Sequence, residues 1–111
     1  MPKELLKKNK GLKDLHQLID SSKDAGLLTR QELVSMMPPL LSDIQAHHSV
    51  FDMCAAPGSK TSQCIELIMA DHLKNNLSTA PIKGIVIAND ADHKRAFLLT
   101  HQINRFNTAN V

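Results

Sequence analysis

The sequence predicts an α/β fold in which a βαβα unit follows two short helices. Three observations lead to this prediction. An apolar run at residues 49–53 passes through a turn of small residues into a helical pattern. A second apolar run occupies residues 84–89, and another helical pattern begins near Asp92. Strands that alternate with helices are typical of a parallel sheet with right-handed crossovers.

Length and composition set the limits of the fold. The chain has 111 residues, enough for one domain at most, and 42% of them are apolar, as in ordinary globular proteins. No stretch has the length and apolarity of a membrane span, and the N-terminus lacks an apolar signal-peptide run. Cys54 and Cys64 make no disulfide framework. We therefore expect free thiols in a reducing compartment and no membrane partner.

Residues 1–28 are predicted to form a basic helical N-terminal segment. Residues 1–30 contain seven Lys and Arg against four acidic residues, although the whole chain carries a formal charge of only +2. A basic arm can attract phosphates, but lysines are equally typical of a solvated helix face. A helix ending near residue 22 is predicted from four apolar residues at helical spacing: Leu12, Leu15, Leu18 and Ile19.

A second helix is predicted over residues 30–37. Thr29 is a good N-cap residue, and Glu32 follows it at the spacing of a capping box. Pro38 and Pro39 should stop or redirect this helix, because proline cannot donate a helical hydrogen bond.

The remaining elements are predicted from residue 49 onward. They are a buried strand over 49–53, a helix from about Lys60, a central strand over 84–89 that is apolar on both faces, a helix capped by Asp92, and a turn at 107–110. Two parallel strands alone leave open edges and an uncovered face. We therefore expect the chain to be part of a longer enzyme, with a small self-contained domain as the alternative.

The segment between the first strand and its helix is the best candidate binding loop. In doubly wound folds, ligands lie beyond the carboxyl ends of the strands. Small residues let the backbone approach a ligand, and Gly58 can adopt a positive φ and leave room above the loop. The amides that open the next helix favour a negative group. Asp90 follows the second strand, where a carboxylate can accept hydrogen bonds from two ribose hydroxyls.

Two phosphate-binding motifs do not fit this loop. A P-loop requires adjacent Gly and Lys with another glycine five residues earlier, but Ser59 separates Gly58 from Lys60 and position 53 is Met. The dinucleotide fingerprint requires three glycines, of which one is present. Spacing alone therefore leaves a nucleoside-binding loop and an ordinary βα turn as open alternatives.

The string Asp-Met-Cys-Ala-Ala-Pro-Gly-Ser-Lys-Thr at 52–61 resembles the first motif of the Sun family of RNA (cytosine-5) methyltransferases. Segments on both sides resemble the same family, including Ile87–Asp90 and Lys94–Arg95, and the similarity covers about residues 14–111. The eukaryotic tRNA branch is the most similar. The resemblance implies a Rossmann-like class I S-adenosylmethionine-dependent methyltransferase fold, of which residues 29–111 would form the N-terminal part.

The resemblance also implies the cofactor, the partner and the roles of individual residues. The cofactor would be S-adenosyl-L-methionine. The substrate would be an RNA, and within the family's eukaryotic branch a tRNA. The protein would be located in the nucleus, with the cytoplasm as the alternative. Asp90 would hold the ribose. The residues wrapping the cofactor, mainly through their backbone, would be Cys54, Ala55, Ala56, Pro57, Gly58, Ser59 and Lys60.

No catalytic residue is predicted within this chain. In the family, one cysteine adds to C6 of cytosine and a second assists release, in Pro-Cys and Thr-Cys motifs. Neither dipeptide occurs in this sequence, so the chain alone is expected to be inactive. The resemblance makes Cys54 a cofactor-loop residue, and Cys64 lies on an apolar helix stripe. The alternative is a degenerate module that binds RNA or a partner protein without turnover.

No metal site is predicted. The six histidines include no pair at the i, i+4 spacing of a helical metal site, and no Cys/His cluster has a zinc pattern.

Overall fold

The computed structural model describes residues 9–75, 80–106 and 108–111. The predicted order of helices and strands is confirmed, together with the α/β class. In chain order the elements are α2 (Lys10–Asp24), α3 (Leu33–Leu41), β1 (Ser49–Asp52), α4 (Ser59–Lys74), β2 (Ile85–Ala88), α5 (His93–Ile103) and the 3-10 turn η1 (Asn104–Phe106).

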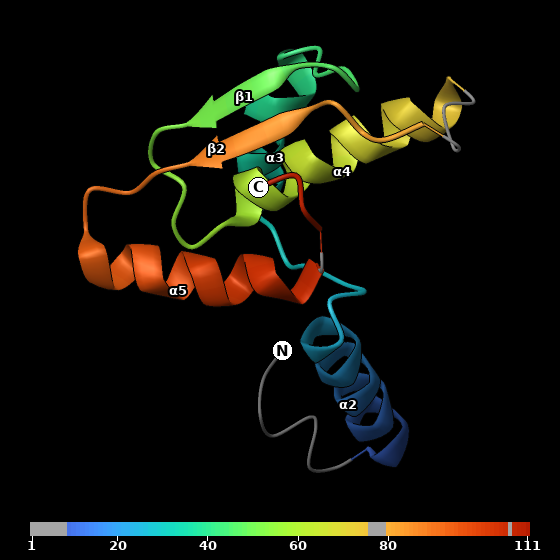
Figure 1. The fold of residues 1–111 in the computed structure, drawn as a ribbon. Coiled ribbons are helices and arrows are strands. Elements are labelled where there is room, and N and C mark those ends of the chain that lie inside the picture. Colours follow the sequence, from blue (N-terminus) through green and yellow to red (C-terminus); the bar gives the residue numbers. More distant parts are fainter. Residues whose placement is uncertain (1–8, 76–79, 107) are drawn as a thin grey trace.

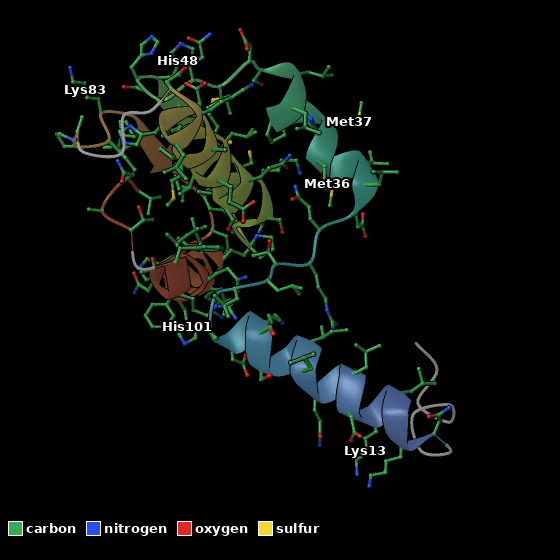
Figure 2. All side chains as sticks on the ribbon, turned by 90° about the vertical axis from the view of Figure 1, so that its right-hand side faces the viewer. Lys13, Met36, Met37, His48, Lys83 and His101 are labelled. Carbon is green, nitrogen blue, oxygen red and sulfur yellow. The ribbon has the colours of Figure 1, made fainter. Side chains whose placement is uncertain are left out.

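The two strands form a small parallel sheet, as predicted. Ser49 pairs with Ile85 at the start of the sheet, and Asp52 pairs with Ala88 at its end. Both strands therefore finish at the same edge, where the chain leaves for α4 and for α5 (Figure 1). His48 and Lys83 lie at the opposite end, just before the strands begin (Figure 2). Ligands of parallel α/β sheets bind at the carboxyl edge, so this edge is where a site is expected.

The core lies between one face of the sheet and the helices α4 and α5. Val86 of β2 and Ile68 of α4 are fully buried, and Leu99 and Ile103 of α5 pack into the same cluster. Side chains alternate between the faces of a strand. The other face therefore carries the exposed apolar residues Phe51, Ile85 and Ile87. The prediction of a central strand over residues 84–89 is wrong for the described chain, because β2 pairs with one strand and helices cover only one of its faces. The predicted burial of the first strand is wrong as well, since every residue of β1 is exposed or half-buried.

The chain returns from α5 to the free edge of β2. The Val86 amide donates to the Asn110 carbonyl at 2.8 Å, and the Asn110 side-chain amide donates to the Gly84 carbonyl at 2.8 Å. The turn predicted at 107–110 includes residue 107, which lies outside the described residues. Residues 108–111 lie along this outer edge of β2.

The predicted limits of the second helix are wrong at both ends. α3 begins at Leu33 with Glu32 at its N-cap, and no side chain caps it. The expected Thr29–Glu32 capping box is therefore absent. The helix also continues through Pro38 and Pro39 to Leu41 instead of stopping before them.

Two glutamines donate to backbone carbonyls of α3 beside its prolines. Proline has no N–H, so Pro39 cannot bond the Ser35 carbonyl one turn earlier. The Gln31 side-chain amide donates to that carbonyl instead, at 3.0 Å. Gln31 also donates to the Gln63 side chain of α4 at 2.8 Å, and Gln63 donates to the Met36 carbonyl at 3.0 Å. The side chains thus replace a missing helical bond and tie α3 to α4.

α2 stands apart from the sheet and the other helices (Figure 1). Its predicted helix is confirmed and ends at Asp24, two residues later than expected, but it has no buried residue. Figure 2 shows Lys13 far from the sheet. The Arg105 guanidinium donates to the Lys23 carbonyl at 3.2 Å, which links the end of α2 to η1. Residues 1–8 of the predicted basic segment lie outside the described residues.

Candidate functional site

The loop between β1 and α4 is fastened to the residue that follows β2. The Asn89 amide donates to the Asp52 carbonyl, and the Ala55 amide donates to the Asn89 carbonyl, both at 2.8 Å. Ala55 and Ala56 are buried, with 3% and 6% of their surface exposed. The loop therefore lies against the carboxyl edge of the sheet, where sequence analysis expected it.

Gly58 has the positive φ predicted for it. Its φ is +107°, and a Cβ at this position would lie 3.0 Å from Leu99 Cδ1 and 3.5 Å from Ile103 Cδ1. The expectation of open room above Gly58 is therefore wrong on this side, because α5 packs directly against the glycine. Glycine is needed here both for the backbone conformation and for this close approach.

The start of α4 is held by bonds on either side of the loop. The Thr61 hydroxyl donates to the Asp52 carboxylate at 2.7 Å. The Ser62 hydroxyl and amide both donate to the Gly58 carbonyl, at 2.7 and 2.9 Å. The N-cap residue of α4 is Gly58, which has no side chain that could bond the first amides of the helix. The positive end of the helix dipole at this position favours an anionic group.

The structure brings Asp90 to the loop. Its carboxylate accepts a hydrogen bond from the Ala56 amide at 3.1 Å through Oδ2 and one from the Asp92 amide at 3.0 Å through Oδ1. The side chain is only 4% exposed. Asp90 therefore lies next to the predicted loop and is bonded to it through the Ala56 amide.

Sequence reasoning missed the part played by Arg95. Its guanidinium Nη2 donates to the Ala56 carbonyl at 2.7 Å and lies 3.3 Å from Asp90 Oδ2. Arg95 is 39 residues from Ala56 in the chain. The resemblance to the family included Lys94–Arg95, but only as part of a similar helix, so no sequence signal pointed to this contact.

The other candidate residues lie along the same loop. Cys54, Pro57 and Lys60 are exposed, and Ser59 is half-buried at the first position of α4. All eight predicted residues therefore lie in one region at the carboxyl edge of the sheet.

The two cysteines differ in their surroundings. Both are free thiols; Cys54 is exposed and Cys64 is buried in the core cluster. Burial, and then the negative charge of Asp52, raises the pKa of the Cys64 thiol. Cys64 is therefore a neutral core residue near neutral pH, as its place on the apolar stripe predicted.

We expect iodoacetamide to modify Cys54 and to spare Cys64 in the folded protein near neutral pH. Thiolate is the reacting form, and Cys64 is both buried and held neutral. Mass spectrometry of the two cysteine peptides measures the difference. The control is the same reaction in urea, where both thiols should react. Equal labelling of both cysteines without urea would show that Cys64 is not shielded.

The described residues contain no group of three or more His, Cys, Asp or Glu side chains placed to hold a metal ion. Within the same ranges, no helix combines the length and apolarity needed to cross a bilayer.

The fold and site define a parallel α/β protein whose first βα loop is bonded to an acidic residue after the neighbouring strand. The model of the family described as 16S rRNA methyltransferase RsmB/F matches residues 39–111, and the chain belongs to this family. The family resemblance drawn from the 52–61 string is thereby confirmed.

Individual relatives match almost the whole chain. It is 48% identical over 116 residues to the multisite-specific tRNA:(cytosine-C(5))-methyltransferase trm4b of Schizosaccharomyces pombe, covering 98% of this chain and 17% of the relative. It is 41% identical to the multisite-specific tRNA:(cytosine-C(5))-methyltransferase of Saccharomyces cerevisiae, covering 100% of this chain and 15% of the relative. The chain is also 40% identical to a tRNA (cytosine(49)-C(5))-methyltransferase of Pyrococcus abyssi, covering 80% of this chain and 24% of the relative. No solved structure shows significant similarity to the chain.

Proposed function

We propose that this chain is the cofactor-binding portion of an S-adenosylmethionine-dependent RNA cytosine-5 methyltransferase that acts on tRNA. The observation that carries the proposal is the hydrogen bond from the Ala56 amide to Asp90, which joins the family's loop to the acid after β2. Support for the substrate comes from the relatives, which are named as tRNA cytosine-C5 methyltransferases. The chain spans only 17% and 15% of these two relatives.

The residues present fit the proposed cofactor. The small buried residues Ala55 and Ala56 put backbone, rather than bulky side chains, beside the ligand. The uncapped start of α4 suits the methionine carboxylate. Asp90 would accept hydrogen bonds from the ribose hydroxyls, and the remaining contacts would come from Cys54–Lys60. When bound, S-adenosylmethionine supplies the methyl group from its sulfonium.

The same proposal assigns the fold and the domain limits. Residues 29–111 would form the N-terminal part of a Rossmann-like class I methyltransferase domain, and residues 1–28 a basic segment before it. The bond between Val86 and Asn110 supports this assignment, because it places backbone along the outer edge of β2, where such a fold adds its next strand. A nuclear location stays a prediction from the resemblance.

In the proposed enzyme this chain binds and orients the methyl donor but supplies no nucleophile. Covalent catalysis of this kind needs a reactive thiolate at the cytosine ring. Cys64 is buried and neutral. Cys54 belongs to the proposed cofactor loop. The catalytic cysteines would come from other parts of the full-length protein.

A non-catalytic RNA- or partner-binding module is the second candidate. It is favoured by one observation, the lack of Pro-Cys and Thr-Cys in this sequence. The coding sequence of the gene separates the two candidates, since the enzyme requires both motifs.

The proposal predicts the outcome of a methyl-transfer assay. The full-length gene product, mixed with S-adenosylmethionine and an unmodified tRNA transcript, should form 5-methylcytosine, which mass spectrometry of the digested tRNA detects. Residues 1–111 alone should form none. A folded full-length protein that binds the cofactor but leaves the tRNA unmethylated would favour the module. Turnover by the 111-residue chain would show that it holds its own nucleophile.

A further inference from the structure

We propose that Arg95 is a positioning residue that holds the loop and Asp90 in the arrangement that receives the methyl donor. This inference rests on the proposed function. It assigns a role to a side chain on α5 that lies outside the predicted set of cofactor contacts.

The three groups form a closed ring of polar contacts. The Ala56 amide donates to Asp90 Oδ2 at 3.1 Å, and Arg95 Nη2 donates to the Ala56 carbonyl at 2.7 Å. The same nitrogen lies 3.3 Å from Asp90 Oδ2, which closes the ring. Both backbone polar groups of Ala56 are therefore fixed by side chains from beyond β2. The loop cannot shift without breaking contacts to Asp90 or to Arg95.

The backbone that carries Arg95 is itself fixed. Arg95 lies in the first turn of α5, and its amide donates to the capping carboxylate of Asp92 at 3.1 Å. The Asp92 amide in turn donates to Asp90 Oδ1 at 3.0 Å. The helix start, the acid and the loop are thus joined as one unit.

Burial shows why a cation is needed at this place. The Asp90 side chain is 4% exposed, whereas that of Arg95 is 55% exposed. A buried carboxylate without a partner is costly, and Arg95 balances its charge while its own head group stays partly hydrated. A neutral residue here would leave Asp90 with backbone amides alone.

The distances also indicate which contact a ribose would replace. A carboxylate has about four acceptor positions, and the three contacts to Asp90 leave about one for two ribose hydroxyls. The contact from Arg95 to Asp90, at 3.3 Å, is longer than its bond to the Ala56 carbonyl, at 2.7 Å. A ribose hydroxyl can therefore take the place of the longer contact, while Arg95 keeps hold of the loop through Ala56.

Hydrogen exchange and calorimetry on the full-length protein test this role. In Arg95→Ala, amides in the 54–58 peptide should exchange about fivefold faster, as expected when one bond of about 1 kcal/mol is lost. Affinity for S-adenosylhomocysteine should fall about fivefold. Arg95→Lys should lie between the wild type and Arg95→Ala, because lysine retains the charge and can donate to one partner. Lys94→Ala is the matched control, since it removes the same charge from an exposed neighbour.

The outcomes separate this inference from the proposed function. Exchange and affinity equal in Arg95→Ala and Lys94→Ala would overturn the positioning role. Tighter binding in Arg95→Ala would also overturn it, because Arg95 would then compete with the ribose. If Arg95→Ala is unfolded, as judged by loss of its far-UV circular dichroism signal, the exchange rate and the affinity of Arg95→Lys are compared with those of Lys94→Ala instead. If the wild type binds no S-adenosylhomocysteine, the proposed function fails, whereas the exchange measurement still tests the link to the loop.

Discussion

Replacing Asp90 with alanine is expected to weaken binding of S-adenosylhomocysteine to the full-length protein by roughly 10- to 100-fold, which corresponds to losing one hydrogen bond to a charged acceptor. The substitution removes the proposed acceptor for the ribose hydroxyls. It also removes the partner of the Ala56 amide, so the loop loses a contact at the same time. Isothermal titration calorimetry measures the affinity directly.

Two further variants make this result specific. Asp90→Asn keeps the size and one acceptor oxygen but loses the charge, so its affinity should lie between those of the wild type and the alanine variant. Glu66→Ala removes a carboxylate from the exposed side of α4 and should bind normally. Unchanged affinity in Asp90→Ala would remove the ribose role from this residue.

Replacing Gly58 with alanine is expected to destabilise the full-length protein by about 2–3 kcal/mol, the range of a strained backbone combined with a tight contact. The residue has a φ of +107°, and a Cβ would approach Leu99 Cδ1 to 3.0 Å. Either the loop or α5 must move to relieve these effects. Urea unfolding measures the change in the free energy of unfolding.

Gly11→Ala is the matched control for the Gly58 substitution. Gly11 lies inside α2, and the nearest atom to an added Cβ is Asn9 Oδ1 at 3.4 Å. Alanine is favoured over glycine within a helix, so this variant should be neutral or more stable by up to about 1 kcal/mol. If both alanine variants unfold at the same urea concentration as the wild type, position 58 does not require glycine.

Features that depend on local sequence were predictable here. Asp92 was expected to cap the last helix, and its carboxylate accepts the Lys94 and Arg95 amides at 2.8 and 3.1 Å. The two apolar runs became the two strands, with their ends shifted by one residue at most. Gly58 has a positive φ because a tight βα turn requires it. In each case the determining residues are neighbours in the chain.

Features that depend on distant residues were not predictable from the same patterns. The Gln31 side chain replaces the bond that Pro39 cannot make to the Ser35 carbonyl, and Gln63 donates to the Met36 carbonyl from another helix, 27 residues away in the chain. Arg95 reaches the Ala56 carbonyl only because α5 packs against the loop. A residue's partners across the fold leave no periodic signal in the sequence, so these contacts emerge only from the structure.

A structure of the full-length protein with S-adenosylhomocysteine bound is the most direct test of the central claim. We expect the nucleoside to lie against the backbone of Cys54–Gly58, with its ribose hydroxyls within hydrogen-bonding distance of the Asp90 carboxylate. Density for the nucleoside at any other edge of the sheet would contradict it, as would a ribose that makes no contact with Asp90.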